Sequence, residues 1–228
     1  MTTGLFIAGT DTEIGKTLIA AAIIRGLAAR GRSVAGMKPV AAGCALTVAG
    51  LRNEDALALN EAATVKLPYD LLNPYAFEPA IAPHIAAADT GTVIDLQHLT
   101  ATYAAIGTLA DVVVVEGAGG WRVPLFPTGY LSDFPETLGL PVVLVVGLRL
   151  GCINHALLTA ERIEQSNARL IGWIGNQVDP GFARMPENID TLRRLLAKPC
   201  LGVIPHLTHA MADALAYIAI DSLISLLG

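Results

Sequence analysis

Aromatic and charged side chains are scarce in this sequence of 228 residues. Aromatic residues make up 5% of the chain and charged residues 15%, whereas 53% of the residues are hydrophobic. Much of the apolar content is alanine, and no uninterrupted apolar stretch approaches the roughly 18 residues that a membrane helix needs. The longest such stretch, 138–148, contains Pro141 and Gly147 and is typical of a buried strand. We therefore expect a protein that does not span a membrane and that packs closely through small side chains.

Cysteine is also rare, and its three copies, Cys44, Cys152 and Cys200, lie far apart. An odd number of widely separated cysteines fits a reducing cytoplasm and the absence of a structural zinc site. The N-terminus lacks a basic segment followed by an apolar core and a cleavage site, so we expect no signal peptide. The five histidines form no metal-ligand spacing, because His206 and His209 would be a pair without a third ligand.

Positive charge is sparse as well. The formal net charge is −5, and lysine and arginine are scattered rather than clustered, which argues against a nucleic-acid surface. No lysine or arginine follows Lys198, so the chain also lacks a basic amphipathic helix at its end. We expect neither nucleic acid nor membrane among its partners. The length suits one large domain over residues 1–228, without repeats or linkers.

The sequence does contain a glycine-rich stretch at 9–17, between an apolar run at 4–8 and a helix-like run at 18–30. A turn from strand to helix is the context that a phosphate-binding loop needs, because glycines let successive N–H groups converge on one anion. Lys16 would supply a charge to the β- and γ-phosphates, and the Thr17 hydroxyl would face Mg²⁺. The sequence therefore predicts nucleotide binding.

The spacing within this loop differs from the usual one. Five residues separate Gly9 from Gly15, one more than usual, and Thr10 stands where the first glycine normally lies. The alternative is a glycine-rich turn in which Thr10 or Thr12 only caps a helix.

Further runs alternate between strand-like and helix-like patterns, which predicts an α/β fold with a mostly parallel sheet flanked by helices on both faces, as in P-loop NTPases. The segment 41–52 is expected to be a loop, and the prolines within 64–83 predict an irregular excursion. The predicted strands are 34–40, 112–116, 141–147, 170–176 and 201–204, and the predicted helices are 54–63, 94–110, 152–167, 186–198 and 211–227.

Polar residues stand where several of these elements meet the predicted ligand edge of the sheet. Glu116 ends a continuous run of valines, and burial of an unpaired carboxylate is costly, so we expect a cation beside it: Mg²⁺, or alternatively a lysine. Lys38 follows the second strand, where a solvated surface charge is the alternative. Asp55 lies in the first turn of a helix, where the dipole alone already favours it. Asn176 ends a strand, and Asn154 lies at a helix start.

Taken together, the motifs resemble the dethiobiotin synthetase family. They span most of the chain in order. The matching stretches are GTDTEIGKT at 9–17, KPVA at 38–41, LRNEDAL at 51–57, NPY at 73–75, PHI at 83–85, VEGAGGW at 115–121 and GCINH at 151–155.

The resemblance implies a homodimeric, ATP- and Mg²⁺-dependent enzyme that carboxylates 7,8-diaminononanoate with CO₂ and closes a ureido ring, giving dethiobiotin, ADP and phosphate. The catalytic residues it implies are Thr12, Lys16 and Lys38, and the metal ligands are Thr17, Asp55 and Glu116. The nucleotide site it implies comprises Glu13, Ile14, Gly15, Lys16, Thr17, Leu18, Asn176, Pro205, His206 and Leu207. The substrate site it implies comprises Thr12, Lys38, Ala42, Gly119, Gly151, Cys152 and Asn154, with the substrate carboxylate at the helix start near Gly151.

The sequence departs from the family pattern in two regions. The family usually carries a serine where this chain has Ala42. On the adenine side of the predicted site, Gln177 and the segment 206–213 differ from the residues expected there. The main alternative is a partition- or regulatory-type ATPase that acts as a switch through protein partners. Such proteins usually carry a second lysine early in the loop, where this chain has Asp11 and Thr12. An amide-forming ligase of the cobyrinate type is a further alternative, but no glutaminase domain accompanies the chain.

Overall fold

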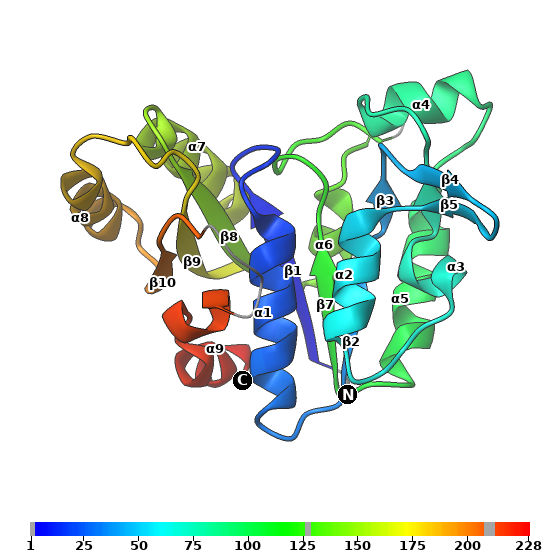
Figure 1. Cartoon of the computed structure of the whole chain (residues 1–228), viewed down its shortest axis with the longest axis horizontal. Helices are drawn as coiled ribbons and strands as arrows, with labels where there is room; N and C mark the ends of the chain where they lie inside the picture. Colours follow the sequence, from blue (N-terminus) through cyan, green and yellow to red (C-terminus); the bar gives the residue numbers. More distant parts are fainter. Residues whose placement is uncertain (1–2, 126–128, 208–212) are drawn as a thin grey trace.

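A six-stranded sheet runs through the middle of the molecule (Figure 1). The structure is a computed structural model that describes residues 3–125, 129–207 and 213–228. The strand order is β10-β9-β8-β1-β7-β2, and every neighbouring pair is parallel, which confirms the predicted fold class. The strands are β1 (Thr3–Gly9), β2 (Val34–Met37), β7 (Val112–Glu116), β8 (Pro141–Leu148), β9 (Arg169–Gln177) and β10 (Cys200–Ile204).

Helices cover both faces of the sheet. Side chains of β1 alternate between the faces, so that Leu5 and Ile7 belong to one core cluster and Phe6 and Ala8 to the other. The first cluster packs against α1 (Lys16–Ala28), α2 (Glu54–Ala62) and α9 (Ile220–Leu227). The second packs against α5 (Leu96–Gly107), α6 (Asp133–Leu138) and α7 (Cys152–Glu164), with α8 (Met185–Leu195) beside α7.

The segments expected to be irregular contain short elements. The predicted loop 41–52 holds an exposed hairpin, β4 (Ala45–Thr47) and β5 (Gly50–Arg52), and β3 (Val40–Ala41) pairs with β6 (Tyr75–Ala76). Two short helices, α3 (Tyr69–Leu72) and α4 (Pro83–Asp89), lie in and after the proline-rich excursion. Hydrogen bonds between residues distant in sequence hold these elements in place. For example, Asn73 Nδ2 donates to Lys38 O at 2.7 Å.

The prediction of one continuous terminal helix over 211–227 is wrong. Within the described residues a 3₁₀ helix, η1 (Asp213–Tyr217), is separated from α9 by Ile218 and Ala219. Ile218 forms an isolated bridge with Gly202, and Ala219 N donates to Leu201 O at 2.8 Å. The chain here pairs with the open edge of β10. This pairing satisfies hydrogen-bonding groups of the edge strand, and it interrupts the helix.

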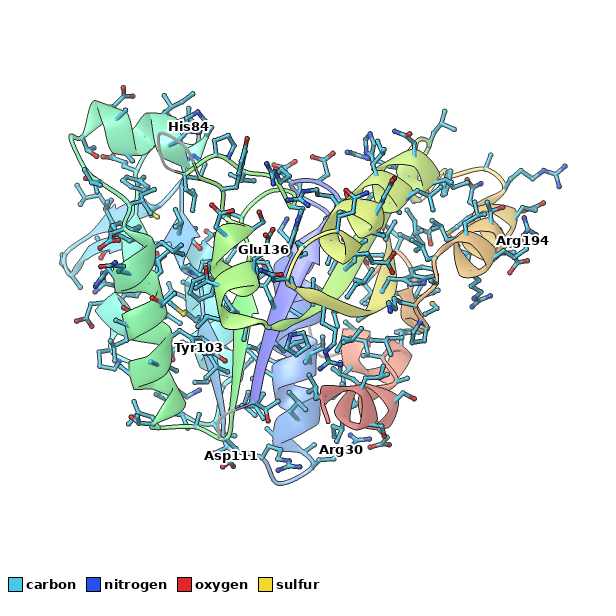
Figure 2. All side chains as sticks on the ribbon, turned by 180° about the vertical axis from the view of Figure 1, so that it is seen from behind. Arg30, His84, Tyr103, Asp111, Glu136 and Arg194 are labelled. Carbon is cyan, nitrogen blue, oxygen red and sulfur yellow. The ribbon has the colours of Figure 1, made fainter. Side chains whose placement is uncertain are left out.

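The carboxyl ends of the parallel strands meet at one edge of the sheet. Ile7 is in register with Glu116, and Met37 with Val115, so the loop after β1, the last residue of β7 and the segment after β2 come together. Arg30 and Asp111 lie at the opposite end of the molecule from His84 of α4 (Figure 2). None of the helices in the described ranges is long and apolar enough to cross a membrane.

Candidate active site

The segment between β1 and α1 folds as an anion-binding loop. Gly15 adopts a left-handed conformation with φ 84° and leads into α1 without a side-chain cap, so the first-turn N–H groups of the helix are left for a ligand. Glu13 is also left-handed, with φ 57°. A Cβ on Gly9 would lie 2.8 Å from Lys16 Cδ, so only glycine lets the loop fold back over its own lysine.

Lys16 lies under this loop and is 6% exposed. Its Nζ donates to Asp11 O at 2.7 Å, which holds the ammonium against the backbone of the loop. Burial, and then the nearby charge of Lys38, lower the pKa of Lys16 to about 8. Lys16 is therefore a buried cation without a carboxylate bonded to it among the described residues, and a phosphate group would satisfy it.

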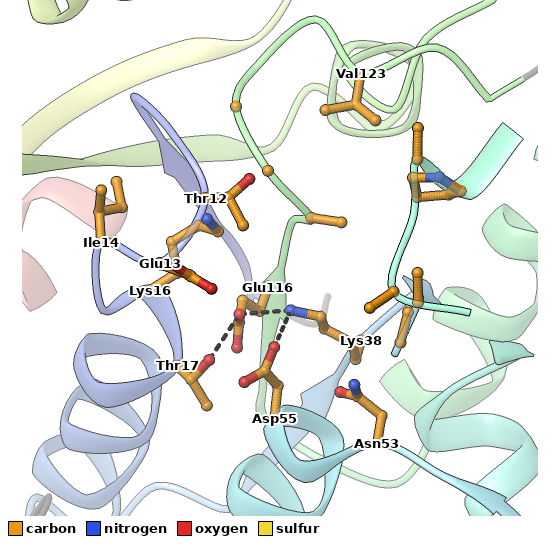
Figure 3. A pocket seen from close by; sticks show the side chains of 18 of the residues that line it. Thr12, Glu13, Ile14, Lys16, Thr17, Lys38, Asn53, Asp55, Glu116 and Val123 are labelled. Atoms are coloured by element: carbon orange, nitrogen blue, oxygen red, sulfur yellow. Dashed lines mark hydrogen bonds and ion pairs between the residues drawn. The ribbon is translucent and has the colours of Figure 1, made fainter. Parts of the chain in front are cut away.

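Lys38 is the centre of a polar network opposite the loop (Figure 3). Its Nζ donates to Glu116 Oε1 at 2.6 Å and to Asp55 Oδ2 at 2.9 Å, and Thr17 Oγ1 donates to the same Glu116 oxygen at 3.0 Å. Lys38 is 4% and Glu116 1% exposed. Lys38 is thus not a solvated surface charge, and the cation predicted beside Glu116 is present in the form of a lysine.

The pKa shifts in this network follow from burial and pairing. Burial alone would lower the pKa of Lys38, but the charges of Glu116 and Asp55 outweigh it and raise that pKa. Burial opposes ionisation of Asp55, yet the pairing with Lys38 prevails and lowers its pKa. Burial raises the pKa of Glu116, against the attraction of Lys38. Removal of the lysine charge would therefore leave Glu116 poorly compensated.

The donor set of this network suits a hard divalent cation. Thr17 Oγ1, Asp55 and Glu116 supply only oxygens, and Glu116 Oε2 is buried without a hydrogen-bond partner in the described part of the chain. Mg²⁺ is commonly held by one or two carboxylates, with waters and phosphates completing an octahedron. The described residues contain no group of three or more His, Cys, Asp or Glu side chains that could hold a metal alone. These residues therefore fit Mg²⁺ brought in with a nucleotide.

A cleft of about 880 Å³ joins the loop to this network and continues beyond it. It brings together most of the predicted site. Its predicted lining residues are Thr12, Glu13, Ile14, Gly15, Lys16, Thr17, Lys38, Ala42, Asp55, Glu116 and Gly119. Sequence reasoning did not include several other residues that line it: Asn53, Ala80, Ile81, Ala82, Pro83, Arg122, Val123 and Pro124. Residues 80–83 fell in the proline-rich excursion, and Asn53 was not assigned to the site although it lies within a motif that matches the family. No prediction was made for residues 122–124.

Other predicted residues lie outside the cleft lining. Gly151, Cys152 and Asn154 begin α7, where Gly151 and Asn154 are exposed and Cys152 is buried. Leu18 follows Thr17 on α1. Asn176, Pro205, His206 and Leu207 lie at the ends of β9 and β10. The segment 206–213 was expected to differ from the family pattern on the adenine side of the site. Part of this segment lies outside the described residues.

Asn176 contacts the phosphate loop although it does not line the cleft. Its Nδ2 donates to Ile14 O at 2.9 Å, and a Cβ on Gly15 would collide with that nitrogen. His206 joins the same region, because its backbone N–H donates to Gln177 Oε1 at 3.1 Å. The predicted adenine residues therefore lie together, beside the loop and apart from the Lys38 network.

The loop, its lysine and the acid at the end of the adjacent strand define a P-loop nucleotide-binding protein. Comparison with known proteins agrees with this class. The family model described as "AAA domain" matches residues 3–214. The ATP-dependent dethiobiotin synthetase BioD of Pseudomonas paraeruginosa is 52% identical over 212 residues, covering 92% of this chain and 93% of its own. The BioD protein of Xanthomonas oryzae is 51% identical over 211 residues, covering 92% of this chain and 94% of its own. The chain belongs to the ATP-dependent dethiobiotin synthetase family of enzymes.

Solved structures of other P-loop proteins share the fold. The MinC:MinD cell division complex of Aquifex aeolicus matches with TM-score 0.61 and 16% identity, covering 100% of this chain and 96% of that chain. MinD of Pyrococcus furiosus matches with TM-score 0.58 and 17% identity, covering 99% and 100%. At this level of identity the likeness concerns the fold alone.

Proposed function

We propose that this protein catalyses the ATP-dependent carboxylation and ring closure of 7,8-diaminononanoate with CO₂, giving dethiobiotin, ADP and phosphate. The observation that carries the proposal is the position of Lys16 and Lys38. They line one cleft that extends past the phosphate loop to Gly119 and Val123, and so leaves room for a second substrate beside a triphosphate.

The reaction needs no nucleophile from the protein. One amine of the substrate attacks the carbon of CO₂ and loses a proton, which gives a carbamate. A carbamate oxygen attacks the γ-phosphorus of ATP, and the bond to ADP breaks. The second amine attacks the carbonyl carbon of the mixed anhydride, the ureido ring closes, and phosphate leaves. Catalysis then rests on positioning and on electrostatic stabilisation of the transferring phosphoryl group.

The two lysines divide this work. Lys16 neutralises charge on the β- and γ-phosphates, and the loop N–H groups hold the same oxygens. Lys38 lies between the γ-phosphate and the carbamate, where a positive charge also disfavours the ammonium form of the substrate amine. Thr12, which lines the same cleft, positions the substrate near the loop. When bound, Mg²⁺ on Thr17, Asp55 and Glu116 withdraws charge from the phosphate oxygens.

The remaining predicted residues bind the adenine end of ATP and the carboxylate end of the diamino acid. Asn176 and the segment Pro205, His206 and Leu207 face the adenine, with Glu13, Ile14 and Leu18 contributing from the loop and α1. Gly151, Cys152 and Asn154 lie outside the cleft lining, so they would reach the substrate carboxylate of a second subunit. Leu150 and Leu158 beside them are 90% and 58% exposed, which supports a homodimer that covers this face of α7.

A cytoplasmic location is part of the proposal. Cys44, Cys152 and Cys200 are all free thiols, as expected in a reducing compartment. Neither nucleic acid nor a membrane takes part in the proposed reaction.

Phosphate release from Mg·ATP tests this function, measured with and without diaminononanoate and bicarbonate and repeated with Lys16→Ala. Release that requires both co-substrates, disappears in the variant and accompanies dethiobiotin detected by mass spectrometry supports the proposal. ATP hydrolysis that ignores the diamine overturns it. That second result would favour the partition-type switch, although Asp11 and Thr12 occupy the place of that family's additional lysine.

A further inference from the structure

Arg122 is a cation at the rim of the cleft that the proposed chemistry leaves unused. Three cationic side chains of the described residues line the cleft: Lys16, Lys38 and Arg122. Lys16 bonds to Asp11 O, and Lys38 is paired with two carboxylates. Arg122 forms no ion pair with any described carboxylate, and its contact is the ring of Tyr130, with Cζ 3.6 Å from the ring centroid.

The backbone around Arg122 holds this contact in place. Leu131 N donates to Val123 O at 2.8 Å, and Pro124 bridges to Tyr130, so the chain doubles back and sets the tyrosine beside the arginine. On the other side, Trp121 is 4% exposed and packs edge-on against Phe6, with ring centroids 6.0 Å apart. An exposed arginine is thus restrained between a buried anchor and an aromatic ring, which reduces the entropy lost when it binds a ligand.

The stacking leaves Arg122 able to bind an anion. A guanidinium over an aromatic ring can keep N–H groups at its edge, in the fork that matches a carboxylate or a phosphate in two parallel hydrogen bonds. Val123, the next residue, also lines the cleft and lies well apart from Glu116 (Figure 3). The phosphates and the reacting amines are assigned to the Lys16 and Lys38 end. The carboxylate of the substrate is the remaining anionic group, at the opposite end of an aliphatic chain.

We propose that Arg122 binds the carboxylate of the diamino acid substrate from within the same subunit, and so selects an acid over an uncharged analogue. This inference rests on the proposed function. It adds a partner to the start of α7, which would reach that carboxylate only from a second subunit. Arg122 then acts on binding of the substrate and not on phosphoryl transfer.

The test compares diaminononanoate with its methyl ester as substrates of the wild-type enzyme and of Arg122→Met. We expect the variant to lower the acid-to-ester ratio of kcat/KM about tenfold, mainly through KM for the acid, because one charge-assisted contact is lost. Its kcat, its KM for ATP and its kinetics with the ester should stay within about twofold of wild type.

Arg52→Met is the matched control. Arg52 also stacks on a tyrosine, with Cζ 4.0 Å from the Tyr69 ring centroid, but it does not line the cleft, so its loss should leave the ratio unchanged. A wild-type ratio in Arg122→Met overturns the role of Arg122 while leaving the enzyme's function intact. Failure of the wild-type protein to make dethiobiotin at all overturns the proposed function and this inference with it.

Discussion

Lys38 Nζ lies 2.6 Å from Glu116 Oε1, and both side chains are almost completely buried. The same ammonium is 2.9 Å from Asp55 Oδ2, so it lies between oxygen atoms of two residues proposed to bind Mg²⁺. A lysine and a divalent cation cannot share this position, because their charges repel strongly at such distances. Metal loading should therefore move Lys38 away from Glu116 and release its charge for the substrate.

We expect Lys38→Met to bind Mn²⁺ more tightly than wild type in the absence of nucleotide. Removal of a competing charge roughly 4 Å away favours the divalent cation by at least about tenfold. Titration followed by Mn²⁺ electron paramagnetic resonance measures this directly, without reference to activity. Product formation should be lost in the same variant, since the charge beside the carbamate is gone.

Lys38→Arg serves as the control for this experiment because it retains the positive charge. Its Mn²⁺ affinity should remain close to that of wild type. Equal or weaker Mn²⁺ binding in Lys38→Met than in wild type would show that the lysine does not compete with the metal.

The lowered pKa of Lys16 predicts a pH-dependent affinity for ATP. Only the protonated amine pairs with a triphosphate, and burial and Lys38 place its pKa at about 8 in the free protein. Affinity should therefore be constant below pH 8 and fall above it, by up to about tenfold per pH unit. Titration with a fluorescent ATP analogue across this range measures the change. Lys16→Arg, which stays protonated, should show a flat profile, and a parallel decline in both proteins would contradict the assignment.

The same shift has a consequence for stability. Because the pKa of Lys16 is about 8 in the folded protein, against an ordinary value of 10.5 for a solvated lysine, the unfolded chain binds more protons between these values. Burial of the ammonium therefore lowers the free energy of unfolding by its full amount below pH 8. This penalty decreases as the pH rises toward 10.5. We expect Lys16→Met to melt roughly 5 °C higher at neutral pH without nucleotide, from a gain of about 2 kcal/mol.

Thermal melts of Lys16→Met at neutral pH and near pH 10 should show a smaller gain at the higher pH. Lys198→Met, which changes a lysine outside the cleft, should shift the melting temperature little at either pH. A Lys16→Met protein that melts below wild type at neutral pH would contradict the predicted cost of burying this charge.

Gly15→Ala should weaken nucleotide binding strongly with little global unfolding. The residue is left-handed, with φ 84°, and a methyl group would collide with Asn176 Nδ2, which contacts the loop. We expect the affinity for ATP to fall more than about tenfold, measured by calorimetry. Gly31→Ala is the matched control, because Gly31 has φ 78° but no atom within 4 Å of the added carbon. It should lose about 1 kcal/mol of stability and keep its affinity for ATP.

Ala42→Ser should improve turnover. Ala42 lines the cleft at the position where the resemblance to dethiobiotin synthetases implies a serine, and a neutral hydrogen bond from a hydroxyl there would be worth about 0.5–1.5 kcal/mol. We expect kcat/KM for the diamine to rise by up to about tenfold, with KM for ATP unchanged. Ala80→Ser adds the same hydroxyl to another residue of the cleft and should have no such effect. Equal kinetics in wild type and Ala42→Ser would show that the chain does not need this bond.

The central sheet was predictable because its strands are buried on both faces. Val112–Glu116 is a continuous run of valines before the acid, and all five residues are buried. Such a run has few alternatives to a parallel strand. The hairpin Ala45–Arg52 and the pairing of β3 with β6 have no such signal, because strands of two or three residues form only through contacts that are distant in sequence.

The candidate site was predictable to the extent that strand ends determine it. Parallel strands bring their carboxyl ends to one edge, so the loop lysine, Lys38 and Glu116 were expected near one another. The direct pairing of Lys38 with Glu116 was not, since a lone lysine after a strand equally fits a solvated charge. Arg122 was missed for a different reason: its position depends on the fold-back to Tyr130, for which no periodic pattern exists.

The register between β1 and β7 also constrains how this sequence can change in length. Ile7 lies opposite Glu116, so the distance from loop to acid is set by strand pairing and not by a flexible connection. Deletion of one residue from β7 would turn the acid to the other face of the sheet, and deletion of one residue from β1 would do the same to the residues that lead into the loop. Insertions and deletions among descendants of this chain should therefore avoid these strands. They should accumulate in the β4–β5 hairpin, whose turn is exposed and projects from the body of the fold.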